Sequence, residues 1–404
     1  MNVIIIGGGA AGFFAAINAA ELHPDASIII LEKSNKLLAK VLVSGGGRCN
    51  VTHACFENSL LVKNYPRGEK ELRSAFSKFT TQDTIEWFKQ HGVTLKTEED
   101  GRIFPVTDNS ETIANCLLQA AHGLNIKIKT GVSVKEININ TDKTFSLKTD
   151  TEYNPQCDKL IIASGGNPKN ENYTWLSRVG HSIIPPVPSL FTFNIPNNEI
   201  TKLMGISVPH AKIKVAGTKL ETEGPLLITH WGLSGPAVLK ASAWGARILN
   251  EKDYHFTAIV NWLPVYKEEA LRDLLIKQKN DHPVKNIGGN SPLEMPKRLW
   301  EFFLQKTGIP ETSRWADINK KQINALINIL WNDSYEVKGK TTFKEEFVTC
   351  GGVSLKEIDF SAMQSKIIPG LFFAGEVLDI DGVTGGFNFQ NAWTTGWIAA
   401  NGLR

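Results

Sequence analysis

The sequence lacks the features that mark several large classes of protein. No apolar run is long enough to cross a membrane, and the chain opens on a predicted strand rather than on the basic stretch of a secretory signal. Cysteine is scarce, and no C-x-x-C pair occurs among Cys49, Cys55, Cys116, Cys157 and Cys350. An odd, scattered set fits a reducing compartment without structural disulfides or a zinc site. We therefore expect a cytoplasmic protein with no membrane partner and no bound metal.

An excess of charge of one sign is also missing. The chain holds 44 Lys and Arg against 41 Asp and Glu, a formal net charge of +3. Because no basic stripe stands out, the sequence predicts no nucleic-acid partner and no attraction to an anionic membrane. What is present is 42% apolar residues and 34 glycines over 404 residues. This is typical of a globular α/β protein with two or three domains.

A glycine-rich motif near the start organises the chain. Residues 3–6 are apolar and mostly β-branched, which indicates a buried parallel strand, and Gly7, Gly9 and Gly12 follow at G-x-G-x-x-G spacing. An alanine-rich helix is predicted over residues 13–21. Gly7 suits the tight turn, Gly9 allows close approach of a pyrophosphate, and Gly12 allows close packing of helix and strand. The helix N-terminus offers N–H groups and positive charge to phosphates.

An acid stands where this motif requires one. A second buried strand over residues 27–31 ends in Glu32, which lies 20 residues past Gly12 and is suited to bind ribose hydroxyls. A carboxylate there disfavours a 2′-phosphate, and so disfavours NADP at this site. Because strand, glycines, helix and acid occur together, we predict a dinucleotide site rather than a glycine-rich surface turn.

A second glycine-rich stretch follows, with Ser44 before three consecutive glycines and Arg48 after them. Its N–H groups and its guanidinium are suited to phosphate or flavin oxygens, and we favour this reading over a flexible linker.

Five motifs together resemble a known family. They are G-G-G-A-A-G at 7–12, S-G-G-G-R-C-N at 44–50, D-G-R-I-F-P at 100–105, T-H-W-G-L-S-G-P at 229–236 and G-E-V-L-D-I-D-G-V-T-G-G-F-N at 375–388. In these the chain resembles, over nearly its whole length, the aminoacetone-oxidase/BaiN-type FAD-dependent flavoproteins, also called HI-type or YhiN-like. The resemblance implies FAD, a Rossmann-like domain, an inserted β-barrel and a helical domain. Activities assigned in the family are mixed, both amine-oxidase-like and NAD(P)H-dependent reductase-like.

The resemblance and the motifs also predict which residues bind the cofactor. The backbone at Val134 is expected to meet the adenine, Ser164 takes the place of threonine in an A-T-G-G turn, and Glu376 is expected to bind ribityl hydroxyls. The whole predicted set is Gly7, Gly9, Ala10, Ala11, Gly12, Glu32, Lys33, Lys40, Ser44, Gly46, Gly47, Arg48, Cys49, Asn50, Val134, Ser164, Gly165, Gly375, Glu376, Gly386, Phe387 and Asn388.

The predicted fold class is α/β. A Rossmann-like FAD-binding domain of the two-dinucleotide-binding type covers 1–188 and 349–404. Short strands with turn signals predict an inserted, barrel-like β-rich domain at 189–264 and 334–348. Helical apolar spacing predicts a small helical domain at 265–333. A last helix opens at Gly386, and we expect its positive end to face the flavin pyrimidine rather than merely to close the fold.

These patterns predict an FAD-dependent oxidoreductase that passes hydride through flavin N5. The donor is NAD(P)H or a small amine, and the acceptor is O2 or an unsaturated or oxidised small molecule. No second G-x-G-x-x-G is clear, so NADH or NADPH is expected to bind only transiently. The sequence identifies no catalytic acid or base and no oligomeric state.

Two other functions stay open. One is a flavin disulfide reductase using Cys49 and Cys55, although their C-x5-C spacing departs from the usual C-x4-C. The other is a non-catalytic flavin-binding redox sensor. The neighbours His230 and Ser234 suggest a hydrolase, but no nucleophile elbow or acid accompanies them, and we expect His230 to be structural.

Overall fold

The computed structural model describes residues 1–289, 291–342 and 348–403, and these divide into two compact units. Unit 1 holds Met1–Ser189 and the described residues from 348 onward, and unit 2 is Leu190–Thr342. In the described part of the chain, no helix combines the length and the apolar character needed to cross a membrane.

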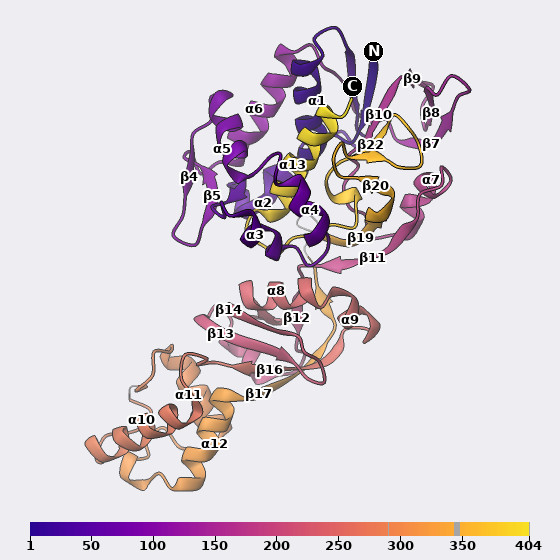
Figure 1. Ribbon diagram of the computed structural model, residues 1–404. Helices are drawn as coiled ribbons and strands as arrows, with labels where there is room; N and C mark the ends of the chain where they lie inside the picture. The colour runs from indigo at the N-terminus through magenta and orange to yellow at the C-terminus, as the bar shows by residue number, and fades with distance from the viewer. Residues whose placement is uncertain (290, 343–347, 404) are drawn as a thin grey trace. The chain divides into compact units, whose positions relative to one another are not determined.

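The centre of unit 1 is a sheet in the order β20-β21-β22-β10-β1-β2-β6 (Figure 1). Its five parallel strands are β1 (Asn2–Ile6), β2 (Ser27–Leu31), β6 (Lys127–Lys129), β10 (Lys159–Ile162) and β22 (Leu371–Phe373). Two short antiparallel strands extend it, β20 (Ile358–Asp359) and β21 (Gln364–Ser365). Apart from a polar first residue, β1, β2 and β10 are apolar, and their apolar side chains are mostly buried, as in parallel sheets that are covered on both faces. The predicted Rossmann-like sheet is confirmed.

Two helices from opposite ends of the chain pack along each other in unit 1. They are α1 (Ala10–Leu22) and α13 (Phe387–Asn401). A Cβ on Gly396 of α13 would lie 2.9 Å from the carbonyl oxygen of Ala11, so glycine is what allows the helices to approach this closely. The packing brings the last motif of the sequence beside the first.

Several other helices of unit 1 pack against this pair. Asn109 caps α6, because its Oδ1 accepts a hydrogen bond from the N–H of Glu111 at 2.9 Å. The helical periodicity of residues 69–92 is divided between α4 and α5, and the second helix restarts at a capping box formed by Thr80 and Asp83. The bounds are α2 (Ala39–Gly47), α3 (Asn58–Leu61), α4 (Glu69–Ala75), α5 (Thr81–Gln90), α6 (Ser110–Gly123) and α7 (Thr174–Ser177).

Three small antiparallel sheets complete unit 1. The first sheet has the strand order β3-β5-β4, with β3 (Thr52–His53), β5 (Arg102–Pro105) and β4 (Leu95–Thr97). A second sheet holds β7 (Val134–Ile139), β8 (Phe145–Thr149) and β9 (Gln156–Cys157). A stretch with three prolines, Pro185, Pro186 and Pro188, forms β11 (Ile183–Ser189), which pairs with β19 (Val348–Val353). Val348 was predicted in the inserted domain but pairs here with Ser189 in unit 1, and residues 343–347 of that prediction lie outside the described residues.

Unit 2 contains a closed sheet. The order is β17-β16-β13-β14-β15-β12-β18, with β12 (Thr192–Asn194), β13 (Ser207–Val215), β14 (Glu221–Thr229), β15 (Gly232–Ser234), β16 (His255–Asn261), β17 (Asp333–Lys338) and β18 (Lys340–Thr341). Only Gly339 separates β17 from β18 along the chain. One stretch of chain therefore forms both edges, and the sheet closes as the predicted barrel. Two helices accompany it, α8 (Pro236–Trp244) and α9 (Ala246–Glu251).

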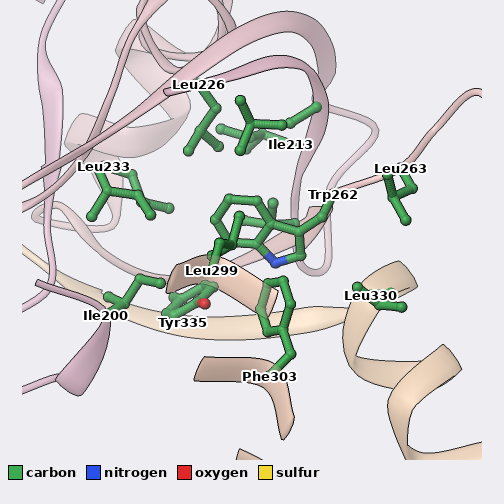
Figure 2. Close-up of a cluster of buried hydrophobic side chains, with 14 of the residues drawn as sticks. Ile200, Ile213, Leu226, Leu233, Trp262, Leu263, Leu299, Phe303, Leu330 and Tyr335 are labelled. Atoms are coloured by element: carbon green, nitrogen blue, oxygen red, sulfur yellow. The ribbon is translucent and has the colours of Figure 1, made fainter. Parts of the chain in front are cut away.

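The helical segment of unit 2 shares its hydrophobic core with the barrel. It consists of α10 (Glu268–Asp281), α11 (Lys297–Lys306) and α12 (Lys320–Trp331). Figure 2 shows Trp262 at the end of β16 meeting Phe303 of α11 and Tyr335 of β17, with ring centroids 5.5 Å and 6.4 Å away. Asp333 accepts hydrogen bonds from Trp262, Tyr335 and Lys306. The separation of 265–333 as a domain of its own stays a prediction.

Candidate cofactor-binding site

The predicted binding residues of unit 1 follow the carboxyl ends of its parallel strands. Glu32 follows β2, the glycine loop follows β1, Ser164 and Gly165 follow β10, and Glu376 follows β22. The sheet order puts these four ends side by side, and the strands that lead to the two acids, β2 and β22, are three strand spacings apart, or about 14 Å. This is the edge at which open α/β sheets bind ligands.

Gly7 and Gly12 have the steric roles predicted for them, and the approach of a pyrophosphate to Gly9 stays a prediction. Gly7 has a φ of +120°, and a Cβ there would lie 2.2 Å from the carbonyl oxygen of Ala163. On Gly12 a Cβ would lie 1.9 Å from the carbonyl oxygen of Gly7, so helix and strand meet only because glycine stands there. Around a Cβ on Gly9, in contrast, no heavy atom lies within 4 Å. Gly9 is also the N-cap of α1 and provides no side-chain cap. The first turn, with Ala10 and Ala11, is therefore suited to a phosphate.

Glu32 is held beside this loop. Its Oε2 accepts the N–H of Gly8 and its Oε1 accepts the N–H of Ser34, each at 2.8 Å. The N–H of Val132 donates to the carbonyl oxygen of Glu32 at 3.0 Å, so the chain that leads into Val134 starts next to the acid. Lys33 is exposed. Contact of these residues with adenosine stays a prediction.

The second glycine stretch has left-handed backbone where the sequence predicted a ligand-facing loop. The last turns of α2 are interrupted at Ser44, and Gly45, Gly46 and Gly47 have φ values of +59°, +69° and +81°. A Cβ on Gly46 or Gly47 would meet no heavy atom within 4 Å, so both backbones are open to a ligand. The N–H of Leu38 donates to the carbonyl oxygen of Gly8 at 2.9 Å and ties α2 to the first glycine loop.

Arg48 points its Nη1 at carboxylates. That atom lies 2.6 Å from Glu98 Oε1 and 3.5 Å from Asp108 Oδ1, and the guanidinium lies 4.0 Å from the ring centroid of Phe104. The hydrogen bond to Glu98 raises the pKa of Arg48. The guanidinium of Arg48 was predicted to contact phosphate or flavin oxygens. Glu98 and Asp108 compete with such oxygens for its N–H groups.

The two cysteines of the disulfide alternative lie in different surroundings. Cys49 is fully buried, and burial raises the pKa of its thiol to about 12. Cys55 is half-buried, and burial raises its thiol pKa as well. Both cysteines are free thiols. Because the thiolate is the nucleophile in disulfide exchange, this environment counts against a redox pair.

Asn50 connects the second glycine stretch with the C-terminal motif. With its amide oriented to satisfy both atoms, it accepts the N–H of Gly386 and donates to the carbonyl oxygen of Thr52, both at 3.0 Å. A Cβ on Gly386 would lie 2.5 Å from the carbonyl carbon of Thr52, and its φ is +94°. Phe387 is buried and stacks on His53 at 4.7 Å. These contacts explain why glycine stands at position 386, the N-cap of α13.

The C-terminal motif also presents the second carboxylate. Glu376 Oε1 accepts the N–H of Thr349 at 2.9 Å, and Oε2 lies 2.5 Å from Lys40 Nζ on α2. Gly375 has a φ of +75° and donates its N–H to Thr395 Oγ1 at 2.8 Å. Three predicted positions from two parts of the sequence, Lys40, Gly375 and Glu376, thus converge here.

Asn388 makes local contacts. Its Oδ1 accepts the N–H of Gly382 at 2.8 Å and its Nδ2 donates to the carbonyl oxygen of the same residue at 3.0 Å. Its predicted contact with the cofactor stays a prediction.

The turn after β10 closes the same region. Gly165 has a φ of +71° and no heavy atom near its Cβ position. A Cβ on Gly166 would lie 2.5 Å from both Glu376 Oε1 and Thr349 Oγ1, which explains the second glycine of the turn. Sequence reasoning missed Thr349, whose hydroxyl is buried and has no hydrogen-bond partner among the residues that the structure describes. No sequence signal marks it, because an isolated threonine in a strand is ordinary.

Sequence reasoning also missed a buried ion pair. Asp381 is fully buried and is paired with Arg67 and with the hydroxyl of Ser189 at 2.6 Å. Burial raises the pKa of Asp381, and Arg67 opposes that shift.

His230 of unit 2 is exposed and packs edge-on against Trp231. Among the described residues, no group of three or more His, Cys, Asp or Glu side chains could hold a metal ion.

The residues present fit FAD. An uncapped helix N-terminus with an open glycine suits the pyrophosphate, and carboxylates on either side suit the hydroxyls of ribose and ribityl. Gly46, Gly47 and Gly165 offer further backbone that a side chain would obstruct.

Comparison with known proteins identifies relatives over the full length of the chain and solved structures with the same fold. The chain is 30% identical over 411 residues to a ribosomal RNA dihydrouridine synthase of Escherichia coli (strain K12), covering 100% of this chain and 98% of that one. It is 28% identical over 408 residues to a 3-dehydro-bile acid delta(4,6)-reductase of Clostridium scindens, covering 99% and 98%. Among solved structures, a 3-ketosteroid delta1-dehydrogenase of Sterolibacterium denitrificans shares the fold, with a TM-score of 0.53, 12% identity and coverage of 99% and 98%.

A family model described as the HI0933-like protein Rossmann domain matches residues 1–402. This confirms the resemblance drawn from the motifs and, at this coarse level, the prediction of an FAD-dependent oxidoreductase. On this match and the full-length relatives, the chain belongs to the HI0933-like family of FAD-binding Rossmann proteins.

Proposed function

We propose that this enzyme uses NAD(P)H to reduce a ring carbon–carbon double bond conjugated to a carbonyl group. The observation that carries the proposal is the pair of full-length relatives. Their printed names give unlike substrates, a uridine in ribosomal RNA and a bile acid derivative, but both names describe saturation of such a bond. A chain that matches both from end to end is best explained by the bond change that they share.

The proposed reaction is balanced without a further reactant. NAD(P)H loses a hydride and becomes NAD(P)+, while the substrate gains that hydride at the carbon β to its carbonyl and a proton from water at the α carbon. FAD, when bound, supplies the two-electron relay between the two partners. The chain holds the pyrophosphate at Gly9 and the first turn of α1, and the sugar hydroxyls at Glu32 and Glu376.

The start of α13 supports a reductase in particular. This helix has 15 residues, and Gly386 at its N-cap provides no side-chain cap. Its positive end therefore favours negative charge on a ring placed beside it, and a reduced flavin carries that charge.

The first substrate class to test is a pyrimidine in ribosomal RNA, because the relative that is 30% identical carries that name. This departs from the expectation, drawn from the net charge, of a small-molecule substrate without nucleic acid. The second candidate substrate is a small cyclic enone, which agrees with the expectation of a small-molecule substrate. The similarity to the bile acid reductase, at 28% identity, favours it.

The test begins with the absorption spectrum of the purified protein and with anaerobic addition of NADH or NADPH. We expect bound FAD that bleaches with one of the two. The reduced enzyme is then mixed separately with unmodified ribosomal RNA and with a 4-en-3-one steroid. Dihydrouridine in the RNA digest supports the first substrate and a saturated ketone supports the second. Bleaching by neither nucleotide, or reoxidation by neither substrate, refutes the proposal and favours the redox sensor.

A further inference from the structure

Unit 2 carries an excess of positive charge that the total net charge conceals. Residues 190–342 hold 20 Lys and Arg against 15 Asp and Glu, a net charge of +5. The rest of the chain holds 24 against 26, a net charge of −2. A sign asymmetry between the two parts of a chain points to a partner of opposite charge on the basic part.

The fold gathers part of this excess at one place on the helical segment. Residues 283–287 run antiparallel to 313–316, with the N–H of Trp315 bonded to the carbonyl oxygen of Lys285 at 3.0 Å and that of Ile287 to Ser313 at 2.8 Å. Arg314 stands opposite Asn286 in the same pairing. The chain then enters α12 at once, whose first two residues are Lys320 and Lys321. The end of α10 reaches the same place, because Lys279 Nζ donates to the carbonyl oxygen of Ile318 at 2.6 Å.

Four of these side chains make up what we call the basic patch: Lys285, Arg314, Lys320 and Lys321. All four are exposed, and none forms an ion pair with a carboxylate of the described residues. Three exposed acids, Asp281, Glu311 and Asp317, lie in the same segments. With Lys279 included, five cations stand against three carboxylates, and the local charge stays positive.

The placement of two of these lysines opposes helix stability. Lys320 and Lys321 occupy the first turn of α12, where the helix dipole favours acids, and that turn contains none. The capping box formed by Asn319 and Gln322, at 2.9 Å and 3.0 Å, already secures the start of the helix. Two unpaired cations against the dipole therefore serve a function other than helix formation, and an anion bound there would relieve their repulsion.

We propose that the basic patch binds the phosphate backbone of RNA, and this rests on the proposed reduction of a pyrimidine in ribosomal RNA. Arg314, Lys320 and Lys321 lie in a stretch of chain that spans about 25 Å at most, and Lys285 lies on the segment that pairs with residues 313–316, an extent that matches several consecutive phosphates. The patch contains no exposed aromatic ring or base-reading constellation, so it supplies affinity and orientation, and sequence choice comes from elsewhere.

The test is binding of a fluorescein-labelled RNA stem-loop to the FAD-loaded full chain over a range of KCl concentrations. The variant carries Lys285→Ala, Arg314→Ala, Lys320→Ala and Lys321→Ala. The control carries Lys70→Ala, Lys89→Ala, Lys127→Ala and Lys169→Ala, four exposed lysines of unit 1, and so has the same change in net charge. FAD content and melting temperature verify that both variants are folded.

Loss of four phosphate contacts should make the plot of log affinity against log salt shallower by about 3 and weaken binding tenfold or more. The control should change the slope by less than about 1. Equal losses in the two variants, or an unchanged slope in the first, overturn the proposal. So does tighter binding of the wild type to phosphatidylglycerol vesicles than to RNA, with only the vesicle affinity lost in the variant.

Dihydrouridine formation by the wild type and by the patch variant distinguishes an error in the proposed function from an error in the patch assignment. If that function is wrong, the wild type makes no dihydrouridine, whatever the patch does. If only the patch assignment is wrong, the wild type makes dihydrouridine and the patch variant does so at the same KM for RNA. A patch variant with a raised KM for RNA and unchanged bleaching by NAD(P)H supports both.

Discussion

Gly9→Val separates cofactor binding from folding. Gly9 has φ −96° and ψ −170°, a conformation that valine adopts readily, and no heavy atom lies within 4 Å of a Cβ placed there. The valine gains about 0.4–1 kcal/mol from the lower entropy of the unfolded chain. It loses about as much because valine is a poor N-cap. We therefore expect the free energy of unfolding of the cofactor-free protein to change by less than about 1 kcal/mol.

The effect on FAD should be far larger. The branched side chain occupies the space through which a pyrophosphate approaches the N–H groups of the first turn of α1. Each hydrogen bond to a charged group contributes about 1.5–3 kcal/mol, so loss of two corresponds to a 100-fold or greater loss of affinity. Quenching of flavin fluorescence measures the affinity, and thermal melting of the stripped protein measures the folding.

Gly12→Val is the matched control. Its Cβ would lie 1.9 Å from the carbonyl oxygen of Gly7, so this variant should fail to fold or melt far below the wild type. A Gly9→Val protein that binds FAD as tightly as the wild type would refute the site assignment. One that unfolds as Gly12→Val does would refute the geometry of the loop.

Four further predictions test other parts of the structure. Glu376→Ala should weaken FAD binding by roughly tenfold to 100-fold, because a charged hydrogen bond to a hydroxyl is lost, and Glu376→Gln should lose less; equal FAD affinity in all three proteins would contradict the role of this acid. Asp333→Ala should destabilise unit 2 by about 3–5 kcal/mol in urea unfolding, because it leaves a lysine, a tyrosine and a tryptophan without their shared acceptor; an unchanged midpoint would be inconsistent with that network. The double variant Cys49→Ala and Cys55→Ala should keep NAD(P)H-driven bleaching, because the Cys49 thiol has a pKa of about 12, and loss of bleaching in a protein that retains FAD would revive the disulfide reductase. Burial lowers the pKa of His181 below 6.5, so its contribution to stability is present above pH 6.5 and is lost as the pH falls through the folded-state pKa; His181→Gln should flatten that slope in the pH dependence of the unfolding free energy, and an unchanged slope would contradict it.

Local patterns were enough to predict the phosphate-binding half of the site. The strand, Gly7, Gly9, Gly12 and Glu32 are close in sequence, and each has a conformational or steric reason that needs no distant partner. The structure bears out the steric reasons for Gly7 and Gly12, whose Cβ positions are blocked, and leaves the Cβ position of Gly9 open. The ligand contacts of Gly9 and Glu32 stay predictions. The alternation of short strands likewise indicated an inserted barrel, since period-two patterning is itself local.

The environment of Arg48 could not be predicted in the same way. The motif marks the residue, but Glu98 reaches it only after the chain has passed through three α-helices and two strands, and Asp108 only after a third strand. The burial of Cys49, which decides between a reactive and an inert thiol, depends equally on what packs over it.

By itself, the sequence determined the class of cofactor, the glycine loop and the presence of a barrel, because these follow from the backbone freedom and apolar period of neighbouring residues. Only the tertiary structure decided that Lys40, Thr349 and Glu376 meet, and that the segments carrying Lys285 and Arg314 pair with each other just before α12 begins. Contacts between residues tens to hundreds of positions apart depend on how strands are ordered and helices packed, and no local pattern specifies that order.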